Sequence, residues 1–187
     1  MTIKNKGFSL VEMLVTVSIV AILMTAAMGS MDYYYRNMAD TRVTSLQKLF
    51  DYSIVMARSE GRNVVICPIS VDSVAIDGSG VVDRPSCNST SNWGNSGIIA
   101  FLADSTSATQ ATSSDDVLTS LASAGDGGQI ASTENKFIIK PTGFFTTDAG
   151  ALIYCRKGQF VAGIKTNMVG RVVYTDDSTD ITSLSCS

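Results

Sequence analysis

The chain has 187 residues, 45% of them hydrophobic, and carries a formal net charge of −3 at pH 7. This length suits one modest globular domain with an appendage, and the acidic balance gives no global electrostatic basis for binding nucleic acid. The sequence contains no histidine. This absence excludes Ser-His-Asp and Cys-His catalysis and removes the commonest metal ligand and pH switch.

The first distinctive feature is an apolar run from Phe8 to about Met28, in which Glu12 is the only charged residue. As a helix, about 20 residues rise about 30 Å, which matches the hydrocarbon thickness of a bilayer. Lys4 and Lys6 precede the run, so we expect the N-terminus to stay in the cytoplasm and the rest of the chain to be exported. The alternative is a cleaved secretory signal peptide, but its apolar region is shorter, about 7–15 residues.

The stretch KGFSLVEMLVTVSIVAIL, residues 6–23, resembles the class III signal of type IV pilins and pseudopilins. The resemblance implies that a prepilin peptidase cuts the chain after Gly7 and that the new N-terminal residue, Phe8, is N-methylated. It also places Glu12 at the family's acidic fifth position of the mature chain. It further implies a single-pass inner-membrane subunit that later joins a filament reaching from the periplasm to the cell surface.

Glu12 needs a partner, because a carboxylate at membrane depth costs about 2.5–3.5 kcal/mol on insertion scales. The resemblance supplies one, since in this family the amine at the position of Phe8 neighbours the glutamate of the adjacent subunit. Pairing largely offsets the desolvation of a buried charge. We therefore predict that Glu12 sets the register between subunits.

Beyond Gly29 the pattern becomes amphipathic. Apolar residues recur at steps of three and four: Val43, Leu46, Phe50, Ile54 and Ala57. The pattern predicts one helix from Phe8 to near Ser59, about 78 Å long. Gly29 lowers the stability of this helix by about 1 kcal/mol relative to Ala, so local melting is expected there.

Two further signals refine this helix. Asp40 is expected to be a cap or first-turn residue, and Gly61 to stop the helix. Tyr33, Tyr34 and Tyr35 follow the apolar run, and we interpret them as an aromatic belt at the membrane interface.

After Gly61 the sequence predicts an antiparallel sheet. Six β-rich segments are bounded mostly by Gly, Pro, Asn or Asp: 63–69, 96–104, 135–140, 150–156, 159–165 and 170–176. The RKGQ sequence, residues 156–159, predicts a short hairpin between two of them. The polar stretches 77–95 and 105–128 are expected to be loops, long enough to suggest a function. A helix followed by such a sheet is an α+β arrangement.

The four cysteines are even in number and lack CxxC or CxxH spacing, which argues against zinc and fits two disulfides formed in an oxidising compartment. Four cysteines allow three pairings. We favour Cys67 with Cys87 and Cys155 with Cys186, because each pair joins neighbours along the chain.

The order of these segments narrows the resemblance to the FimU/FimT group of minor pilins and to the H-type pseudopilin of type II secretion. It covers nearly the whole chain except the loop from Ser105 to Glu134. It implies a pilin fold with a leader at 1–7, a transmembrane and assembly helix at 8–29, an amphipathic helix at 30–61 and a periplasmic or extracellular sheet domain at 62–187. The expected role is a minor pilin that joins other minor pilins and the major pilin, priming pilus assembly at the tip. The alternatives are the H-type pseudopilin and a FimT-like DNA-uptake pilin.

No catalytic or metal-binding constellation is found in the sequence. The acids Asp115, Asp116 and Asp126 could form a calcium site, but they lack the alternating oxygen ligands and terminal Glu of an EF-hand, which favours a solvated loop. We therefore expect no enzyme activity, no cofactor and no metal.

DNA contact is the remaining question. Six basic residues and one acid, Asp148, lie between positions 136 and 171: Lys136, Lys140, Arg156, Lys157, Lys165 and Arg171. On one edge of the sheet they could contact phosphates. FimT-type DNA-uptake pilins carry Gly-Arg-x-Arg in this region. Gly170 and Arg171 match, whereas Val173 departs from the motif, so Gly170, Arg171, Lys165 and Lys157 are only weak candidates for DNA contact.

Overall fold

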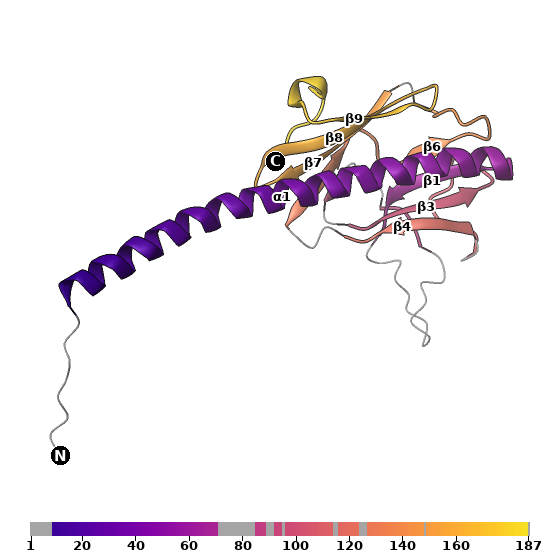
Figure 1. The fold of residues 1–187 in the computed structure, drawn as a ribbon. Coiled ribbons are helices and arrows are strands. Elements are labelled where there is room, and N and C mark those ends of the chain that lie inside the picture. The colour runs from indigo at the N-terminus through magenta and orange to yellow at the C-terminus, as the bar shows by residue number, and fades with distance from the viewer. Residues whose placement is uncertain are drawn as a thin grey trace, which may run out of the picture. The chain divides into compact units, whose positions relative to one another are not determined.

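The computed structural model describes residues 9–70, 85–88, 92–94, 96–113, 116–123, 127–147 and 149–186 (Figure 1). The chain forms two compact units, Met1–Met38 and Ala39–Ser187. One long helix contributes to both units, and two antiparallel sheets belong to the second.

Helix α1 spans Leu10–Glu60 and contains no proline, so nothing removes a backbone donor along its length. It continues through Gly29, and Gly61 follows its end with a positive φ of 63°, a conformation that glycine adopts without strain. The helix thus agrees closely with the expected range, and Gly61 is its stop. Asp40 is not a cap, because it lies in the interior of α1, where apolar residues continue the helical pattern on both sides.

The first sheet has the strand order β4-β3-β1-β6. Its strands are β1 (Asn63–Pro68), β3 (Ile98–Ala103), β4 (Val117–Leu121) and β6 (Phe137–Ile139). Strand β1 is central, with Asn63 opposite Ala103 and Pro68 opposite Ile98 in β3. Pro68 closes its strand, where a missing backbone donor does least harm to the ladder.

The second sheet has the order β2-β5-β7-β8-β9. Its strands are β2 (Asn92–Gly94), β5 (Gly128–Ser132), β7 (Ala149–Arg156), β8 (Gln159–Asn167) and β9 (Val172–Thr175). Lys157 and Gly158 form the expected hairpin between β7 and β8, with φ of 49° and 72°. Two successive positive φ values are typical of the turn that matches strand twist.

The sequence prediction was wrong in two respects. The domain holds two sheets where one was expected, strands β2 and β4 lie in stretches expected to be loops, and β5 was not among the predicted strands. The sequences of β4 (VLTSL) and β5 (GQIAS) have few β-branched or aromatic residues, so their strand propensity is weak. Pairing with neighbours that are already strongly extended decides their structure.

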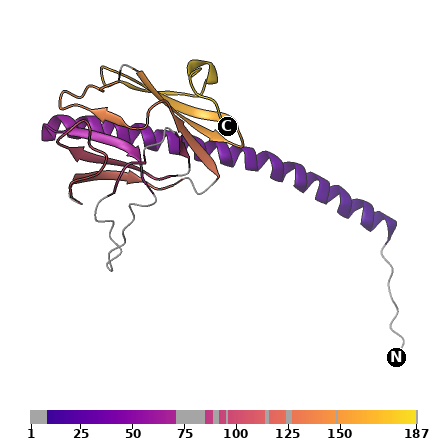
Figure 2. The same ribbon diagram turned by 180° about the vertical axis from the view of Figure 1, so that it is seen from behind.

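The core of the second unit forms between the sheets and the second half of α1, and the view from behind shows the same helix segment lying along the strands (Figure 2). Seven apolar residues of the helix are buried: Ala39, Val43, Leu46, Leu49, Phe50, Ile54 and Ala57. Phe50 and Phe137 meet edge to face with ring centroids 5.2 Å apart. Trp93 is fully buried, and its Nε1 donates to the Glu134 carbonyl at 2.9 Å.

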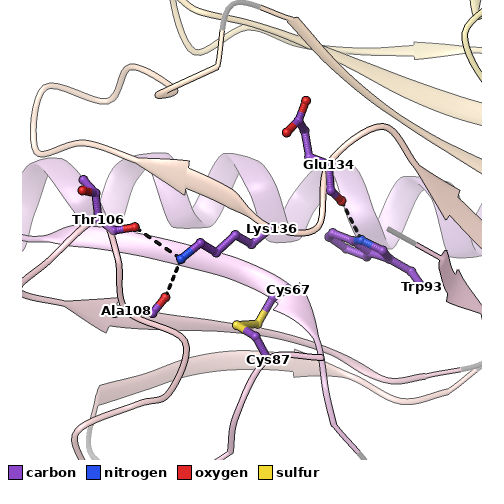
Figure 3. Close-up of a disulfide and its surroundings, with 7 residues drawn as sticks. All are labelled: Cys67, Cys87, Trp93, Thr106, Ala108, Glu134 and Lys136. Atoms are coloured by element: carbon purple, nitrogen blue, oxygen red, sulfur yellow. Dashed lines mark hydrogen bonds between the residues drawn. A yellow bond between two sulfur atoms is a disulfide. The ribbon is translucent and has the colours of Figure 1, made fainter. Parts of the chain in front are cut away.

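Two disulfides, Cys67–Cys87 and Cys155–Cys186, are present, and these are the pairings that the sequence favoured. The first lies beside Lys136, whose Nζ donates to the carbonyls of Thr106 and Ala108 (Figure 3). Burial lowers the pKa of Lys136. This lysine therefore fixes the segment after β3 and is not part of an open basic surface.

Candidate assembly interface

The segment Leu10–Ala27 of α1 is long and apolar enough to cross a membrane, with a mean hydropathy of 2.3, and none of it is buried within the chain. The exposed large side chains include Leu10, Val11, Met13, Leu14, Val17, Ile19, Ile22 and Leu23. A helix that is apolar on all sides is stable only when lipid or other helices surround it.

The hydroxyl groups in this segment are satisfied within the helix. Thr16, Ser18 and Thr25 donate to the carbonyls of Met13, Leu14 and Ile22 at 2.8–2.9 Å. Such local bonds remove the cost of placing a hydroxyl in an apolar environment. The segment is therefore suited to full burial, with the exception of one side chain.

That side chain is Glu12, in the first turn of α1. Its backbone N–H donates to Ser9 Oγ at 3.2 Å, as at a helix N-cap. Its carboxylate has no ion-pair partner within the described part of the chain. Gly7 and Phe8, the residues expected at the cleavage site, lie outside the described residues.

The tyrosines beyond the apolar segment remain accessible. Tyr33 and Tyr34 are 70% and 58% exposed, and the rings of Tyr34 and Tyr35 meet edge to face at 5.7 Å. These positions agree with an interfacial belt, which stays a prediction.

Polar contacts fasten the second half of α1 to the sheets. Arg42 donates through both terminal nitrogens to the carbonyls of Ala122 and Ser123, at 2.7 and 2.6 Å. On another side of the helix, Tyr174 in β9 donates its hydroxyl to Asp40 at 2.8 Å. The pKa of Tyr174 is raised to about 12, mainly by burial of its hydroxyl and secondly by this hydrogen bond.

One of the three acids considered as a calcium site has an arginine as its partner. Asp116 accepts a hydrogen bond from Arg62 Nη1 at 2.7 Å, and Arg62 also reaches Asp104 at 2.8 Å. The bond from Arg62 lowers the pKa of Asp116. Asp115 and Asp126 lie outside the described residues, and the described ones contain no cluster of acids that could hold a metal ion.

Gly170 has a structural role in the turn between β8 and β9. Its φ is +85°, and an added Cβ would lie 2.4 Å from the Gly143 carbonyl oxygen, so no other residue fits without a shift. The N–H of Arg171 donates to Asn167 Oδ1 at 2.9 Å, while its side chain is exposed. The match to Gly-Arg therefore has an explanation in the turn alone.

Of the candidate DNA contacts, Lys157 lies apart from Arg171, whereas Lys165 and Arg171 are two residues apart along the β8–β9 ladder. Lys157 precedes β8 and Arg171 follows it, and a nine-residue strand separates them by about 30 Å. Lys165 lies 3.5 Å from Asp180, so an acid already faces its charge.

Comparisons with known proteins agree with this arrangement. Residues 3–28 match the prokaryotic N-terminal methylation motif, and residues 42–170 match the type II transport protein GspH. The chain belongs to the GspH family. No match was found among curated proteins.

The fold of this GspH-family protein is similar to that of the Pseudomonas aeruginosa type IV minor pilin FimU. Two crystal forms of FimU give TM-scores of 0.51 and 0.52 at 13% and 11% identity, covering 83% and 79% of this chain and 99% of each FimU chain. The α+β pilin fold is thus confirmed. Together with the methylation motif, family membership identifies a prepilin-type structural subunit of a pilus or pseudopilus, processed by a peptidase and assembled with other pilins; it is not an enzyme.

Sequence reasoning missed the residues that fasten the helix to the sheets. Arg42 bonds to carbonyls that follow β4, a strand that was not predicted, so its partner was invisible. Tyr174 lies 134 residues from Asp40, and only the fold brings them together. Asp40 is an acidic residue next to the apolar positions of an amphipathic helix, and this is the sequence signal that could have marked it as a contact to the sheet.

Proposed function

We propose that this GspH-family protein is a minor pilin that joins the complex priming type IV pilus assembly at the tip. It is cut between Gly7 and Phe8, is N-methylated on Phe8, and is anchored in the inner membrane before it enters the filament. Its apolar helix then exchanges lipid for the helices of neighbouring subunits, and its sheet domain offers surfaces to specific partners.

One observation carries the proposal: Leu10–Ala27 is wholly exposed, Glu12 is its only charged residue, and its three hydroxyl groups are hydrogen-bonded within the helix. Among packed helices an unpaired Glu12 would cost several kcal/mol, whereas a Phe8 amine from the adjacent subunit would offset much of that cost. A subunit shifted along the helix bundle would lose this pair. Glu12 therefore sets the register.

The second candidate is the H-type pseudopilin of a type II secretion system, which the description of the matching family favours. Both candidates use the same helix, signal and sheet. A FimT-like DNA-uptake pilin receives less support, because Lys165 faces Asp180 and Gly170 serves the turn.

Substitution of Glu12 tests the assembly mechanism. We expect Glu12→Ala to be cleaved and methylated normally, as shown by the mass of the mature N-terminus, but to leave few assembled filaments. Ser18→Ala is the matched control, because it changes a polar side chain of the same segment without removing a charge. Wild-type filament numbers for Glu12→Ala would refute the register role.

Deletion of the gene separates the candidates when pili, protein secretion and DNA uptake are scored side by side. Loss of pili with intact secretion supports the minor pilin. Lost secretion with normal pili would move the chain to the pseudopilins. Loss of DNA uptake alone would indicate that the exposed basic residues, including Arg171, bind DNA.

A further inference from the structure

The exposed large apolar side chains of the sheet domain are concentrated at one place. Outside α1, four are exposed among the described residues: Phe144, Met168, Val169 and Val173, at 44%, 46%, 66% and 40%. Single exposed apolar residues are normal on a folded domain, whereas several adjacent ones mark an interaction site. All four lie on two short segments, 143–145 and 168–173.

These two segments lie side by side. The N–H of Phe145 donates to the Met168 carbonyl at 3.0 Å. Gly143 and Gly170 are in backbone contact, since a Cβ added at Gly170 would overlap the Gly143 carbonyl oxygen. The four exposed side chains therefore belong to one surface, the apolar patch, made by Phe144, Met168, Val169 and Val173.

Alternation along the extended segments shows which way the patch faces. Phe145 is buried, and its ring centroid lies 6.1 Å from that of Phe50 in α1, so the preceding Phe144 points away from the helix. Val172 belongs to the same core, so Val173 points outward. Phe144 and Val173 thus lie on the side of the domain away from α1.

Arg58 fixes the patch at the end of the domain where α1 stops. This arginine lies in the last turn of α1, and its Nε donates to the Thr142 carbonyl at 3.3 Å. Gly143 and Gly170 have φ of 80° and 85°, and a Cβ on Gly143 would overlap the Arg58 guanidinium. The two glycines allow the end of the helix to hold both segments, so the patch is ordered before any partner binds.

Positive charge borders the patch. Within 136–175 the described residues include no acidic one. Lys140 is exposed opposite Phe144, to whose carbonyl its N–H donates at 2.8 Å. Arg171 is exposed on the same face of β9 as Val173. Neither Lys140 nor Arg171 has an ion pair within the described part of the chain.

The composition of this surface favours a protein partner over a nucleic acid. Apolar side chains at the centre with charge at the rim are typical of a protein–protein interface, whereas surfaces that bind DNA are more polar and much more positively charged. Two bases, Lys140 and Arg171, would give few phosphate contacts. The complementary protein surface is apolar with acidic residues at its rim.

A second copy of this chain is a poor match for that description. The acids beyond the opposite end of β9 already accept hydrogen bonds within their own chain. Asp177 caps the 3-10 helix η3 (Ser178–Asp180) by accepting from Thr179, and Asp180 accepts from Thr175 at 2.9 Å. We therefore expect the partner to be a different chain.

Membrane anchoring limits how this partner can lie. Subunits that share an N-terminal membrane segment enter a filament with their helices parallel, so a two-fold axis perpendicular to α1 is excluded. The contact must then join two different surfaces. Because the patch lies where α1 stops, it meets a subunit that entered the filament earlier.

We propose that the apolar patch, with Lys140 and Arg171 at its rim, binds an earlier pilin subunit of the same filament through an apolar surface edged with aspartate or glutamate. This contact rests on the proposed assembly role, and it adds the surface and the chemistry by which this chain selects its neighbour.

Photo-cross-linking in cells that assemble filaments tests the contact directly. The photoreactive residue p-benzoylphenylalanine replaces Val169, which is 66% exposed and leaves room for a larger side chain. As a control it replaces Lys157, which is exposed in the β7–β8 turn. We expect position 169 to form an adduct with a pilin that carries its own N-terminal methylation motif, and the cross-linked peptide to contain aspartate or glutamate. Position 157 should not cross-link to that peptide.

Other adducts decide against the proposal. A cross-link from position 169 to a second copy of this chain, to DNA or to lipid would each overturn it, as would the absence of any adduct. The same holds if position 157 gives the same cross-linked peptide in equal yield.

Charge reversal at the rim gives an independent test. We expect Arg171→Glu to lower the number of filaments about tenfold, because like charges would then face each other across the contact. Lys140→Glu should act in the same direction, and Lys157→Glu is the control for the change of charge. Trp93 fluorescence checks that each variant is folded. Changing the cross-linked acid of the partner to lysine should restore assembly of Arg171→Glu.

The results distinguish this docking surface from the proposed function. If deletion of the gene leaves both pili and secretion intact, the proposed function is refuted. If deletion abolishes filaments while Arg171→Glu and Lys140→Glu assemble normally, or if the partner's lysine restores nothing, only the docking surface is refuted.

Discussion

The two halves of helix α1 have opposite relations to the rest of the chain. In Leu10–Ala27 every residue is exposed, although the mean hydropathy is 2.3. In Ala39–Ala57 most apolar residues lie on one face, and the seven apolar residues of that face are buried with exposures of 0–6%. The second half takes its stability from contacts that the protein makes with itself, whereas the first half depends on lipid or on other subunits.

This difference separates folding from assembly within a single helix. A change in the buried half should alter the stability of the sheet domain, and a change in the exposed half should alter only membrane insertion or filament formation. Trp93, the single tryptophan, is fully buried in the domain and reports its unfolding.

The most direct challenge to the comparison makes the same substitution in both halves. Leu46 is 3% exposed and Leu14 is 63% exposed. We expect Leu46→Ala to lower the free energy of unfolding of the sheet domain by about 3–5 kcal/mol, because it leaves a cavity in the core. Leu14→Ala should leave that free energy unchanged in denaturant titrations followed by Trp93 fluorescence. Equal losses of free energy would mean that both halves of α1 contribute to the stability of the sheet domain.

Removal of a disulfide should have the next largest effect. The pair Cys155→Ser and Cys186→Ser frees a segment of 31 residues, and we expect it to lower the free energy of unfolding by about 2–4 kcal/mol. The same titration measures this loss, and peptide mapping without reduction should find Cys67–Cys87 and Cys155–Cys186 in the unmodified chain. A stability equal to that of the unmodified protein would mean that the C-terminal segment adds nothing to the domain.

Much of the fold could be predicted because strong local patterns set it. The helical spacing from Val43 to Ala57 and segments such as NVVICP specify their structure without long-range information. Strands β4 and β5 could not be predicted, since VLTSL and GQIAS are extended only through pairing with β3 and β7. The division into two sheets likewise depends on which strands pair, and strand composition does not encode this.

The assembly segment was predictable for a different reason. Glu12 is the only charged residue in a long apolar run, and this feature is visible in the sequence without any knowledge of the fold. The contacts of the basic residues were harder to predict, because the charge of a side chain does not show which groups it will bond to. Lys136 bonds to two carbonyls and Lys165 faces Asp180, so a cluster in the sequence becomes several separate structural contacts.

A smaller effect should come from Asp116, which stabilises the junction after α1 through Arg62. The pKa of Asp116 is lowered from 3.8 by this bond, so its contribution is present above pH 3.8 and is lost as the pH falls through the lowered pKa. We expect Asp116→Asn to cost about 1 kcal/mol at neutral pH, since the pair is only partly buried. The cost should shrink in acid when stability is compared at several pH values. Asp104→Asn, which removes the more exposed partner of Arg62, should cost less.

The smallest change tests whether the buried half of α1 also needs its polar contacts. Tyr174→Phe removes the hydroxyl that Asp40 accepts while keeping the ring, so we expect a loss of about 1 kcal/mol. The pKa of Tyr174 is raised from 10 to about 12, which means that its contribution is intact below pH 10 and disappears as the pH rises towards 12. Alkaline titration of tyrosine absorbance should therefore lose a step near pH 12 in Tyr174→Phe. Tyr52→Phe is the control, because Tyr52 is 45% exposed on the same helix and its loss should leave that step in place. If the free energy of unfolding of Tyr174→Phe equals that of the unmodified protein, the hydrogen bond to Asp40 adds nothing to the attachment of β9 to the helix.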